Sequence, residues 1–137
     1  MKKYQIPFMD LHKQYIAIKD EIDEAIKNVI STSSFIRGKY VDLFEEKFQE
    51  YFEVPYCISC ANGTDALFIA MKSLDIKQSD EVIVPAHSWI STSETVTQAG
   101  GKVVFCDVDP DTFTIDPRKI QEKITSKTVG IIPVHLF

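Results

Sequence analysis

The residues Asn62-Gly63-Thr64-Asp65 have the types and the spacing needed to bind an anion. They follow the apolar run Val54 to Ile58 and precede a helical pattern of apolar residues at positions 66–74, an order that predicts strand, tight turn and helix. The first backbone N–H groups of a helix have no partner inside it, and with the helix dipole they form an anion site. Gly63 lets the backbone approach a ligand closely, and the Thr64 hydroxyl adds a donor.

The same turn has a simpler interpretation. An Asn-Gly pair with Thr64 or Asp65 as the helix cap is an ordinary connection between a strand and a helix. The spacing alone favours this simpler interpretation, so features elsewhere in the chain must decide between the two.

Cys57-x-x-Cys60, which lies just before this turn, has the spacing of a redox or metal motif. A thioredoxin-like pair needs its first thiol at a helix N-terminus, whereas Cys57 falls inside the apolar run. A zinc site needs two more ligands, and the chain has no second closely spaced Cys or His pair. We therefore expect no metal site, and we expect Cys57, Cys60 and Cys106 to be small buried hydrophobic residues.

The composition restricts the class of protein. With 137 residues, 45% of them hydrophobic, the chain is long enough for one domain with a real core. The net charge of -5 argues against binding to nucleic acid or to an anionic membrane. No apolar run approaches the roughly 20 residues that cross a bilayer, and the positive start Met1 to Pro7 has no apolar segment behind it. We expect a cytoplasmic protein.

Two amphipathic helices are predicted in an N-terminal helical segment, residues 1–53. The first begins after the cap Asp10, keeps apolar residues at helical spacing as far as Val29, and ends at the polar residues 31–34. The second carries Val41, Phe44, Phe48 and Phe52 at the same spacing.

From residue 54 the pattern changes to alternating strands and helices. Strands are predicted at 54–58, 81–84, 103–106 and 129–134, and helices at 65–74, at 91–99 and from Asp116-Pro117 onward with Ile120 and Ile124 on the apolar face. Because the strands are continuously apolar, we expect an α/β domain over 54–137 with a mainly parallel sheet covered by helices on both faces.

Ligands of open α/β sheets bind beyond the carboxyl ends of the strands. One such end carries the turn at Gly63, and the next carries Trp89, the single tryptophan of the chain. A phosphorylated, flat, aromatic ligand would suit this pair, with its ring stacked on the indole. The alternative is that Trp89 anchors the helix that follows it.

Four further polar residues follow strand ends. His87 and His135 each lack a partner of catalytic type in the sequence, and an isolated His at such a place is more often a hydrogen-bonded structural residue. Asp107 and Asp109 more often cap the turn before Pro110 than bind a ligand.

Six segments in this order resemble the N-terminal part of the DegT/DnrJ/StrS-type nucleotide-sugar aminotransferases. They are Ile6 to Leu11, Phe35 to Phe48, Ala61 to Leu67, Val84 to Trp89, Gly100 to Asp109 and Ile132 to Phe137. The resemblance implies the large domain of the aspartate-aminotransferase fold and the cofactor pyridoxal 5′-phosphate (PLP). It assigns Gly63, Thr64 and Asp65 to the phosphate of PLP and Trp89 to stacking on its ring.

The resemblance also implies a reaction and partners. Members of the family transfer an amino group, usually from glutamate, to a keto-sugar linked to a nucleotide diphosphate, and they act as homodimers with active sites at the subunit interface. The family's Schiff-base Lys and the Asp that pairs with the pyridine nitrogen lie further along than residue 137. We therefore expect no catalytic residue in this chain, which would be an N-terminal part that is inactive by itself.

Two alternatives remain open. A PLP-dependent sugar dehydratase or epimerase has the same fold, with a His in place of the Schiff-base Lys in the dehydratase branch. A non-catalytic module that binds phosphate or a nucleotide could use the same turn, although it leaves Trp89 and the two N-terminal helices without a role.

Overall fold

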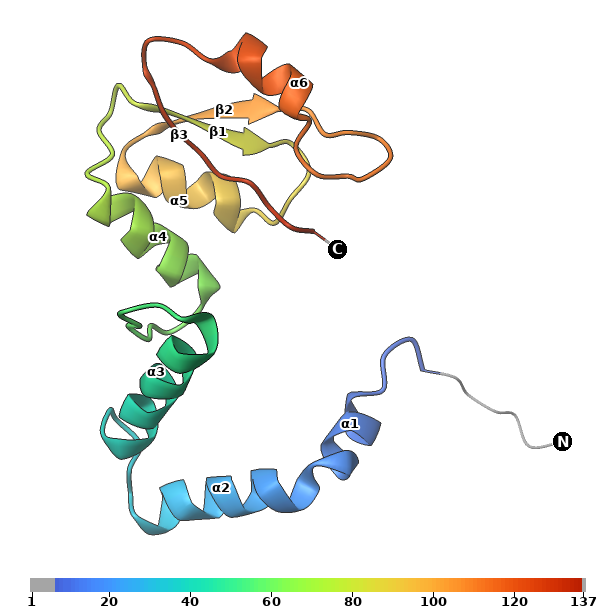
Figure 1. Ribbon diagram of the computed structural model, residues 1–137, viewed down its shortest axis with the longest axis vertical. Helices are drawn as coiled ribbons and strands as arrows, with labels where there is room; N and C mark the ends of the chain where they lie inside the picture. Colours follow the sequence, from blue (N-terminus) through green and yellow to red (C-terminus); the bar gives the residue numbers. More distant parts are fainter. Residues whose placement is uncertain (1–6, 137) are drawn as a thin grey trace, which may run out of the picture. The chain divides into compact units, whose positions relative to one another are not determined.

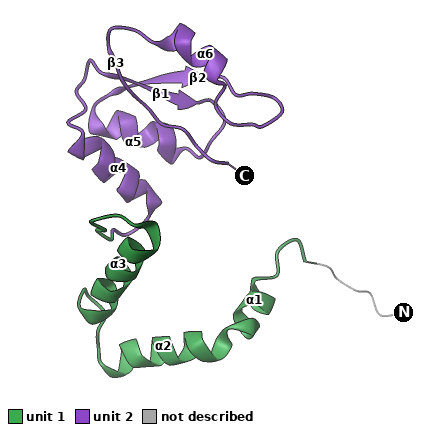
Figure 2. Cartoon of the chain, in the orientation of Figure 1, with its two compact units in different colours: residues 1–59 green, residues 60–137 purple. Residues whose placement is uncertain are grey.

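The computed structural model describes residues 7–136. Ile6 and Phe137, which begin the first and end the last of the six family-like segments, lie outside these residues. The chain forms two compact units, residues 1–59 and 60–137 (Figure 2). No helix within the described residues is long and apolar enough to cross a membrane.

The first unit contains the helices α1 (Leu11–Ala17), α2 (Lys19–Ser31) and α3 (Lys39–Phe52) (Figure 1). Asp10 caps α1 as predicted, and its Oδ1 accepts the Lys13 N–H at 2.9 Å. The single helix predicted here is wrong, because the backbone leaves the helical region at Ile18 (φ -124°, ψ 17°). A break of one residue keeps the apolar spacing nearly continuous, so the sequence pattern does not reveal it.

Side chains bridge this break. The Tyr15 hydroxyl donates to Asp23 Oδ1 at 2.7 Å, and the Lys19 ammonium pairs with the other oxygen of the same carboxylate. The hydrogen bonds from Lys19 and Tyr15 lower the pKa of Asp23.

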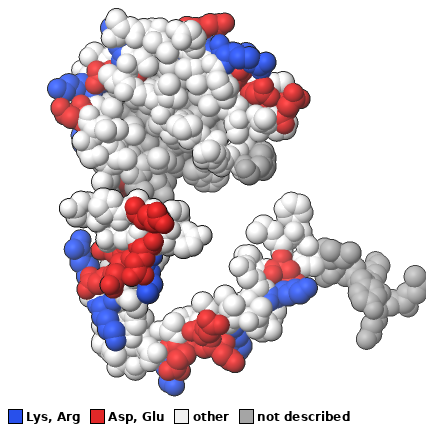
Figure 3. Space-filling model, viewed as in Figure 1, with Lys and Arg blue, Asp and Glu red and all other residues white. Residues whose placement is uncertain are grey.

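The helices of the first unit have no buried residue within the described part of the chain. Ile22, Ile26 and Ile30 of α2 and Phe44 and Phe48 of α3 are all exposed large apolar residues. Figure 3 shows more acidic than basic side chains on these helices, as expected from the composition. The first unit therefore has apolar helix faces but no core of its own.

The strand predicted at 54–58 is not formed. The segment is irregular, because an extended chain becomes a strand only when a neighbouring strand pairs with its backbone. It is held instead by Glu45 of α3, whose Oε1 accepts the backbone N–H of Ser59 at 2.8 Å and the Ser59 hydroxyl at 2.7 Å. These hydrogen bonds lower the pKa of Glu45.

The second unit is built on a three-stranded sheet in the order β2-β1-β3. Its elements are α4 (Gly63–Ser73), β1 (Glu81–Pro85), α5 (Ser91–Ala99), β2 (Lys102–Cys106), α6 (Pro117–Ile120), a 3₁₀ turn η1 (Gln121–Lys123) and β3 (Thr128–Ile131). All pairs are parallel, with Val82 opposite Val103 and Ile83 opposite Ile131. The predicted α/β class with a parallel sheet is confirmed.

The core lies on both faces of β1. Val82 and Val84 pack with Met71 of α4 and Val96 of α5, while Ile83 faces the opposite cluster. The members of that cluster are Ile83, Cys106 and Ile115, with Val104 and Ile120 packed against them. Figure 1 shows α5 and α6 on opposite faces of the sheet. Because β1 and β2 are parallel, their carboxyl ends lie at one edge of the sheet, where Ala86 N–H donates to the Cys106 carbonyl at 2.8 Å.

The two C-terminal elements are shorter than predicted. Asp116 caps α6 as expected, with Oδ1 accepting the Arg118 N–H at 2.9 Å and Pro117 in the first turn. Ile124, however, has an extended backbone beyond η1 and is not on the helix face predicted for it. The strand expected at 129–134 ends at Ile131, soon before Pro133, which has no backbone N–H to donate.

Candidate functional site

The start of α4 is capped by Asn62, which precedes both caps considered from the sequence, Thr64 and Asp65. Asn62 Oδ1 accepts the Asp65 N–H at 2.9 Å, and Asn62 Nδ2 donates to Asp65 Oδ2 at 3.0 Å. The helix begins at Gly63, two residues before the predicted start at residue 65, because the cap lies at Asn62. The ordinary cap and the anion site are therefore both possible in one turn.

The cap leaves donors free at the helix start. Within residues 7–136, no hydrogen-bond acceptor is paired with the backbone N–H groups of Gly63 and Thr64. A Cβ placed on Gly63 would have no protein atom within 4 Å, so the space beside this backbone is open. Two unpaired N–H groups at the positive end of an 11-residue helix, next to open space, make this turn a candidate site for an anion.

Thr64 joins this turn to the next helix of the unit. Its side chain is half-buried, and Oγ1 lies 2.7 Å from the hydroxyl oxygen of Ser91, the first residue of α5. Ser91 is only 4% exposed. The spacing of residues in the sequence did not identify Ser91. The run of hydroxyl residues that follows Trp89 is the one sequence signal that could have pointed to it.

Trp89 lies in the loop between β1 and α5 and is 76% exposed. It borders a hollow of about 180 Å³ lined by Pro85, Ala86, Ser88, Trp89, Ile90, Thr92, Ser93 and Phe105. An indole so exposed is not packed as an anchor of α5, so its face is accessible to a ligand. Trp89 is two residues from Ser91, and Ser91 contacts Thr64, which links the aromatic loop to the anion site.

The aspartates after β2 have structural partners. Asp107 accepts Lys119 Nζ at 2.6 Å, and Asp109 accepts Arg118 Nη2 at 2.8 Å and the Asp111 N–H at 2.9 Å. The hydrogen bond from Lys119 lowers the pKa of Asp107. Both aspartates therefore stabilise their turn, as the simpler interpretation held.

The buried Asp116 belongs to the same network. Arg118 donates to it from the backbone N–H and from Nε, each at 2.9 Å, and these contacts lower the pKa of Asp116. The network holds the loop that carries Phe113, whose ring lies edge-on to His87 with centroids 6.2 Å apart. His87 and His135 are both exposed.

The cysteines do not form a site. Cys106 is buried, and burial raises the pKa of its thiol, but Cys57 is only half-buried and Cys60 is exposed. The expectation of three buried cysteines is confirmed for Cys106 and wrong for Cys60. The described residues contain no group of three His, Cys, Asp or Glu side chains able to hold a metal ion.

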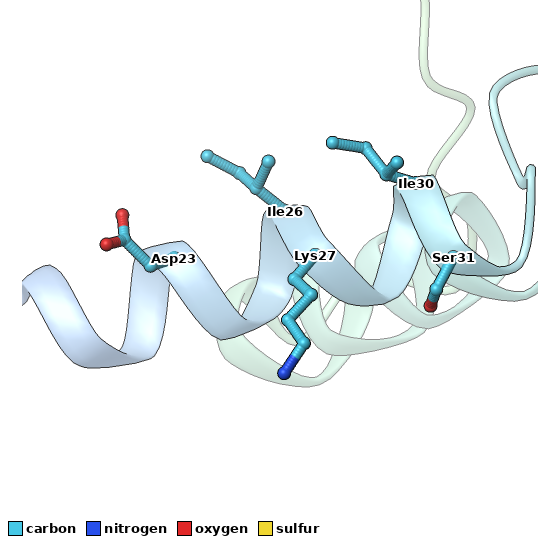
Figure 4. Close-up of a pocket in the computed structure, with 5 residues that line it drawn as sticks. All are labelled: Asp23, Ile26, Lys27, Ile30 and Ser31. Carbon is cyan, nitrogen blue, oxygen red and sulfur yellow. The ribbon is translucent and has the colours of Figure 1, made fainter.

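The larger hollows lie on the first unit. One of about 350 Å³ is lined by Asp23, Ile26, Lys27, Ile30 and Ser31, all on α2. Figure 4 shows Ile26 and Ile30 on a different side of the helix from Lys27 and Ser31, so no polar groups converge there. A second, of about 500 Å³, is bordered by apolar and aromatic residues only. The start of α4 is the better candidate.

Comparison with known proteins identifies one family. The sequence model of the DegT/DnrJ/EryC1/StrS aminotransferase family matches residues 16–137. A UDP-2-acetamido-2-deoxy-3-oxo-D-glucuronate aminotransferase of Pseudomonas aeruginosa is 42% identical over 96% of this chain and 37% of its own length. A 3-oxo-glucose-6-phosphate:glutamate aminotransferase of Bacillus subtilis is 36% identical over 97% of this chain and 30% of its own. The chain thus spans about a third of the length of these relatives.

Solved structures agree with the family match. DesV of S. venezuelae superposes with a TM-score of 0.91 at 34% identity, over 97% of this chain and 36% of that one. NtdA of Bacillus subtilis with bound cofactor PMP gives 0.88 at 36% identity, over 99% and 32%. The E. coli GDP-4-keto-6-deoxy-D-mannose-3-dehydratase with hydrated PLP gives 0.75 at 32% identity, over 80% and 30%. The predicted aminotransferase fold is confirmed by these likenesses.

Proposed function

Because this chain belongs to the DegT/DnrJ/EryC1/StrS aminotransferase family, we propose that it forms the phosphate-binding part of a PLP-dependent sugar aminotransferase. The substrate is a keto-sugar linked to a nucleotide diphosphate, and the amino donor is glutamate. The observation that carries the proposal is the start of α4, where the N–H groups of Gly63 and Thr64 have no acceptor among the described residues and the space beside Gly63 is open.

The residues at this turn fit the phosphate of PLP. The N–H groups of Gly63 and Thr64 and the Thr64 hydroxyl would hold the phosphate oxygens, and Asp65 belongs to the same turn. The exposed indole of Trp89 would stack on the pyridine ring. PLP, when bound, serves as the electron sink that amino transfer requires.

The names of relatives support the reaction and the donor. The P. aeruginosa relative is named for a 3-oxo sugar nucleotide, and the B. subtilis relative is named for glutamate. We place the protein in the cytoplasm, since the composition and the family both suit a soluble biosynthetic enzyme.

The proposed assembly is a homodimer with its active sites at the subunit interface. Two features of the described residues support it. The helices α1, α2 and α3 bury none of their residues, and β2 and β3 each have an edge with no neighbouring strand in residues 7–136. Exposed apolar faces and unpaired edges both favour association.

We assign no catalytic residue to residues 1–137. Amino transfer with PLP needs a lysine amine and a carboxylate beside the ring nitrogen, and the family resemblance places both further along than this chain extends. These residues alone should therefore bind phosphate or PLP weakly and transfer no amino group. Treatment of the 137-residue chain with PLP and borohydride should give no stoichiometric adduct by mass spectrometry.

The decisive experiment uses the full-length protein that contains these residues. It should show the absorbance of bound PLP, lose that band when glutamate is added, and convert a keto-sugar nucleotide into its amino-sugar product. A product that has lost water instead of gaining an amino group would favour the dehydratase alternative, which the likeness to the E. coli enzyme supports. A protein that binds phosphate but not PLP would favour the non-catalytic module.

A further inference from the structure

Ser91 is the buried partner of the Thr64 hydroxyl. Its Oγ lies 2.7 Å from Thr64 Oγ1, and the bond joins the first turns of α4 and α5 across a separation of 27 residues in sequence. Within the described part of the chain, the Ser91 hydroxyl has Thr64 as its sole hydrogen-bond partner. The Ser91 carbonyl has a different partner, because it accepts the Thr95 hydroxyl at 2.7 Å.

When an anion is present, the number of hydroxyl protons decides which of Thr64 and Ser91 donates the hydrogen bond between them. Each hydroxyl carries one proton and two acceptor lone pairs, so with no anion either residue can donate to the other. A phosphate ester with ionised oxygens accepts hydrogen bonds and needs a donor. If Thr64 gives its one proton to the phosphate, its contact with Ser91 persists only when Ser91 donates to Thr64 Oγ1.

We propose that Ser91 is a positioning residue for the phosphate site, a role that rests on the proposed function. Its hydroxyl donates to Thr64 Oγ1 and directs the Thr64 proton toward the phosphate of PLP. The bond also fixes the start of α5, two residues after Trp89, against the start of α4. The bond thereby fixes the distance between the proposed phosphate site and the proposed stacking site.

A purely structural role for Ser91 predicts different behaviour. Removal of a buried hydroxyl from α5 would then lower stability and weaken every ligand of the site alike. Thr95 provides the matched control, since it lies in the same helix, is fully buried and donates its hydroxyl hydrogen bond to the Ser91 carbonyl, not to Thr64. Thr95→Val removes this hydroxyl at nearly constant side-chain volume.

The test measures dissociation constants of PLP and of pyridoxal, which lacks the phosphate, with the full-length apoprotein. Ser91→Ala should weaken PLP binding roughly twofold to tenfold, the effect of one neutral hydrogen bond. It should leave the dissociation constant of pyridoxal unchanged. Thr95→Val should change the dissociation constant of neither PLP nor pyridoxal. In a Thr64→Ala background, Ser91→Ala should have no further effect on PLP, because Ser91 acts through the Thr64 hydroxyl.

Three results would overturn the role of Ser91 alone, provided that the wild-type protein binds PLP. They are an unchanged affinity of Ser91→Ala for PLP, an equal loss for PLP and pyridoxal, and full additivity with Thr64→Ala. Failure of the wild-type protein to bind PLP overturns the proposed function, and the role of Ser91 with it. The wild-type titration therefore separates the two failures.

Discussion

Asn62 and Asp65 bind each other at the start of α4 through two hydrogen bonds. Asp65 N–H donates to Asn62 Oδ1 at 2.9 Å, and Asn62 Nδ2 donates to Asp65 Oδ2 at 3.0 Å. The pair satisfies one N–H group of the first turn and ties the Asp65 carboxylate to the cap. It leaves the N–H groups of Gly63 and Thr64 without an acceptor among the described residues, so the capped turn is still able to bind an anion, as we propose.

Replacement of the cap should affect stability. Asn62→Ala removes the acceptor for the Asp65 N–H and should lower the free energy of unfolding by about 1 kcal/mol. Asn62→Asp keeps an acceptor at this position and should retain most of the stability, but its added negative charge should weaken anion binding. Denaturant unfolding and a PLP titration of both variants measure the two effects. Equal stability of Asn62→Ala and the wild type would show that the cap contributes nothing.

Loss of the Thr64 hydroxyl should affect the phosphate. Thr64→Ala should weaken PLP binding by about 1.5–3 kcal/mol, the contribution of a hydrogen bond to a charged group. Thr64→Ser keeps the hydroxyl and is the matched control. Titration of the full-length apoprotein gives both dissociation constants, and an unchanged PLP affinity in Thr64→Ala would remove this residue from the site.

Much of the second unit could be predicted from the sequence because local pattern and tertiary contact agree there. The fully buried β1 reads as a continuous apolar run, and Gly100, with φ 104°, ends α5 where the sequence places a stop. Asp116-Pro117 starts α6 for the same reason, since cap and proline act within one turn. In these elements the deciding residues are neighbours in the chain, so the sequence shows them.

Features set by distant partners could not be predicted. Residues 54–58 have strand-like composition, but the described residues provide no strand to pair with them, and Glu45 binds Ser59 instead. The contact between Thr64 and Ser91 depends on how α4 packs beside α5, which no spacing within either helix reports. The turn that we propose as an anion site is visible in the sequence, whereas Ser91, the partner of the Thr64 hydroxyl, is not.

Substitution of Trp89 should separate stacking from core packing. Trp89→Ala should shift or weaken the cofactor absorbance of the full-length protein, while Trp89→Phe, which keeps an aromatic face, should largely preserve it. Because the indole is 76% exposed, neither change should lower the unfolding midpoint much. A large loss of stability with an unchanged spectrum would show that Trp89 supports the fold instead.

Close packing at Gly101 makes this position sensitive to one methyl group. A Cβ there would lie 2.6 Å from Ile76 Cγ2 and 3.2 Å from Val96 Cγ1. Gly101→Ala should therefore lower the free energy of unfolding by about 1–3 kcal/mol. Gly130→Ala in β3 is the control, since its Cβ would meet nothing within 4 Å. Denaturant unfolding compares them, and equal stability of the two variants would mean that α5 and Ile76 shift without cost.

Glu81, at the opposite end of β1 from the anion site, should make stability depend on pH. It is 6% exposed, and its carboxylate accepts Lys102 Nζ at 2.8 Å and the Thr125 hydroxyl at 2.6 Å. The hydrogen bond from Lys102, followed by that from Thr125, lowers the pKa of Glu81 in the folded protein. The unfolded chain should show the ordinary glutamate pKa of about 4.3.

A lowered pKa in the folded state means that the unfolded chain binds the proton more tightly. The stabilisation from Glu81 is therefore complete above the ordinary glutamate pKa and is lost as the pH falls through the lowered pKa of the folded state. Glu81→Gln should be less stable than the wild type at pH 7, and the difference in unfolding midpoint should shrink as the pH is lowered below about 4.3. A difference between Glu81→Gln and wild type that stays constant down to acid pH would show that the ion pair with Lys102 does not control this titration.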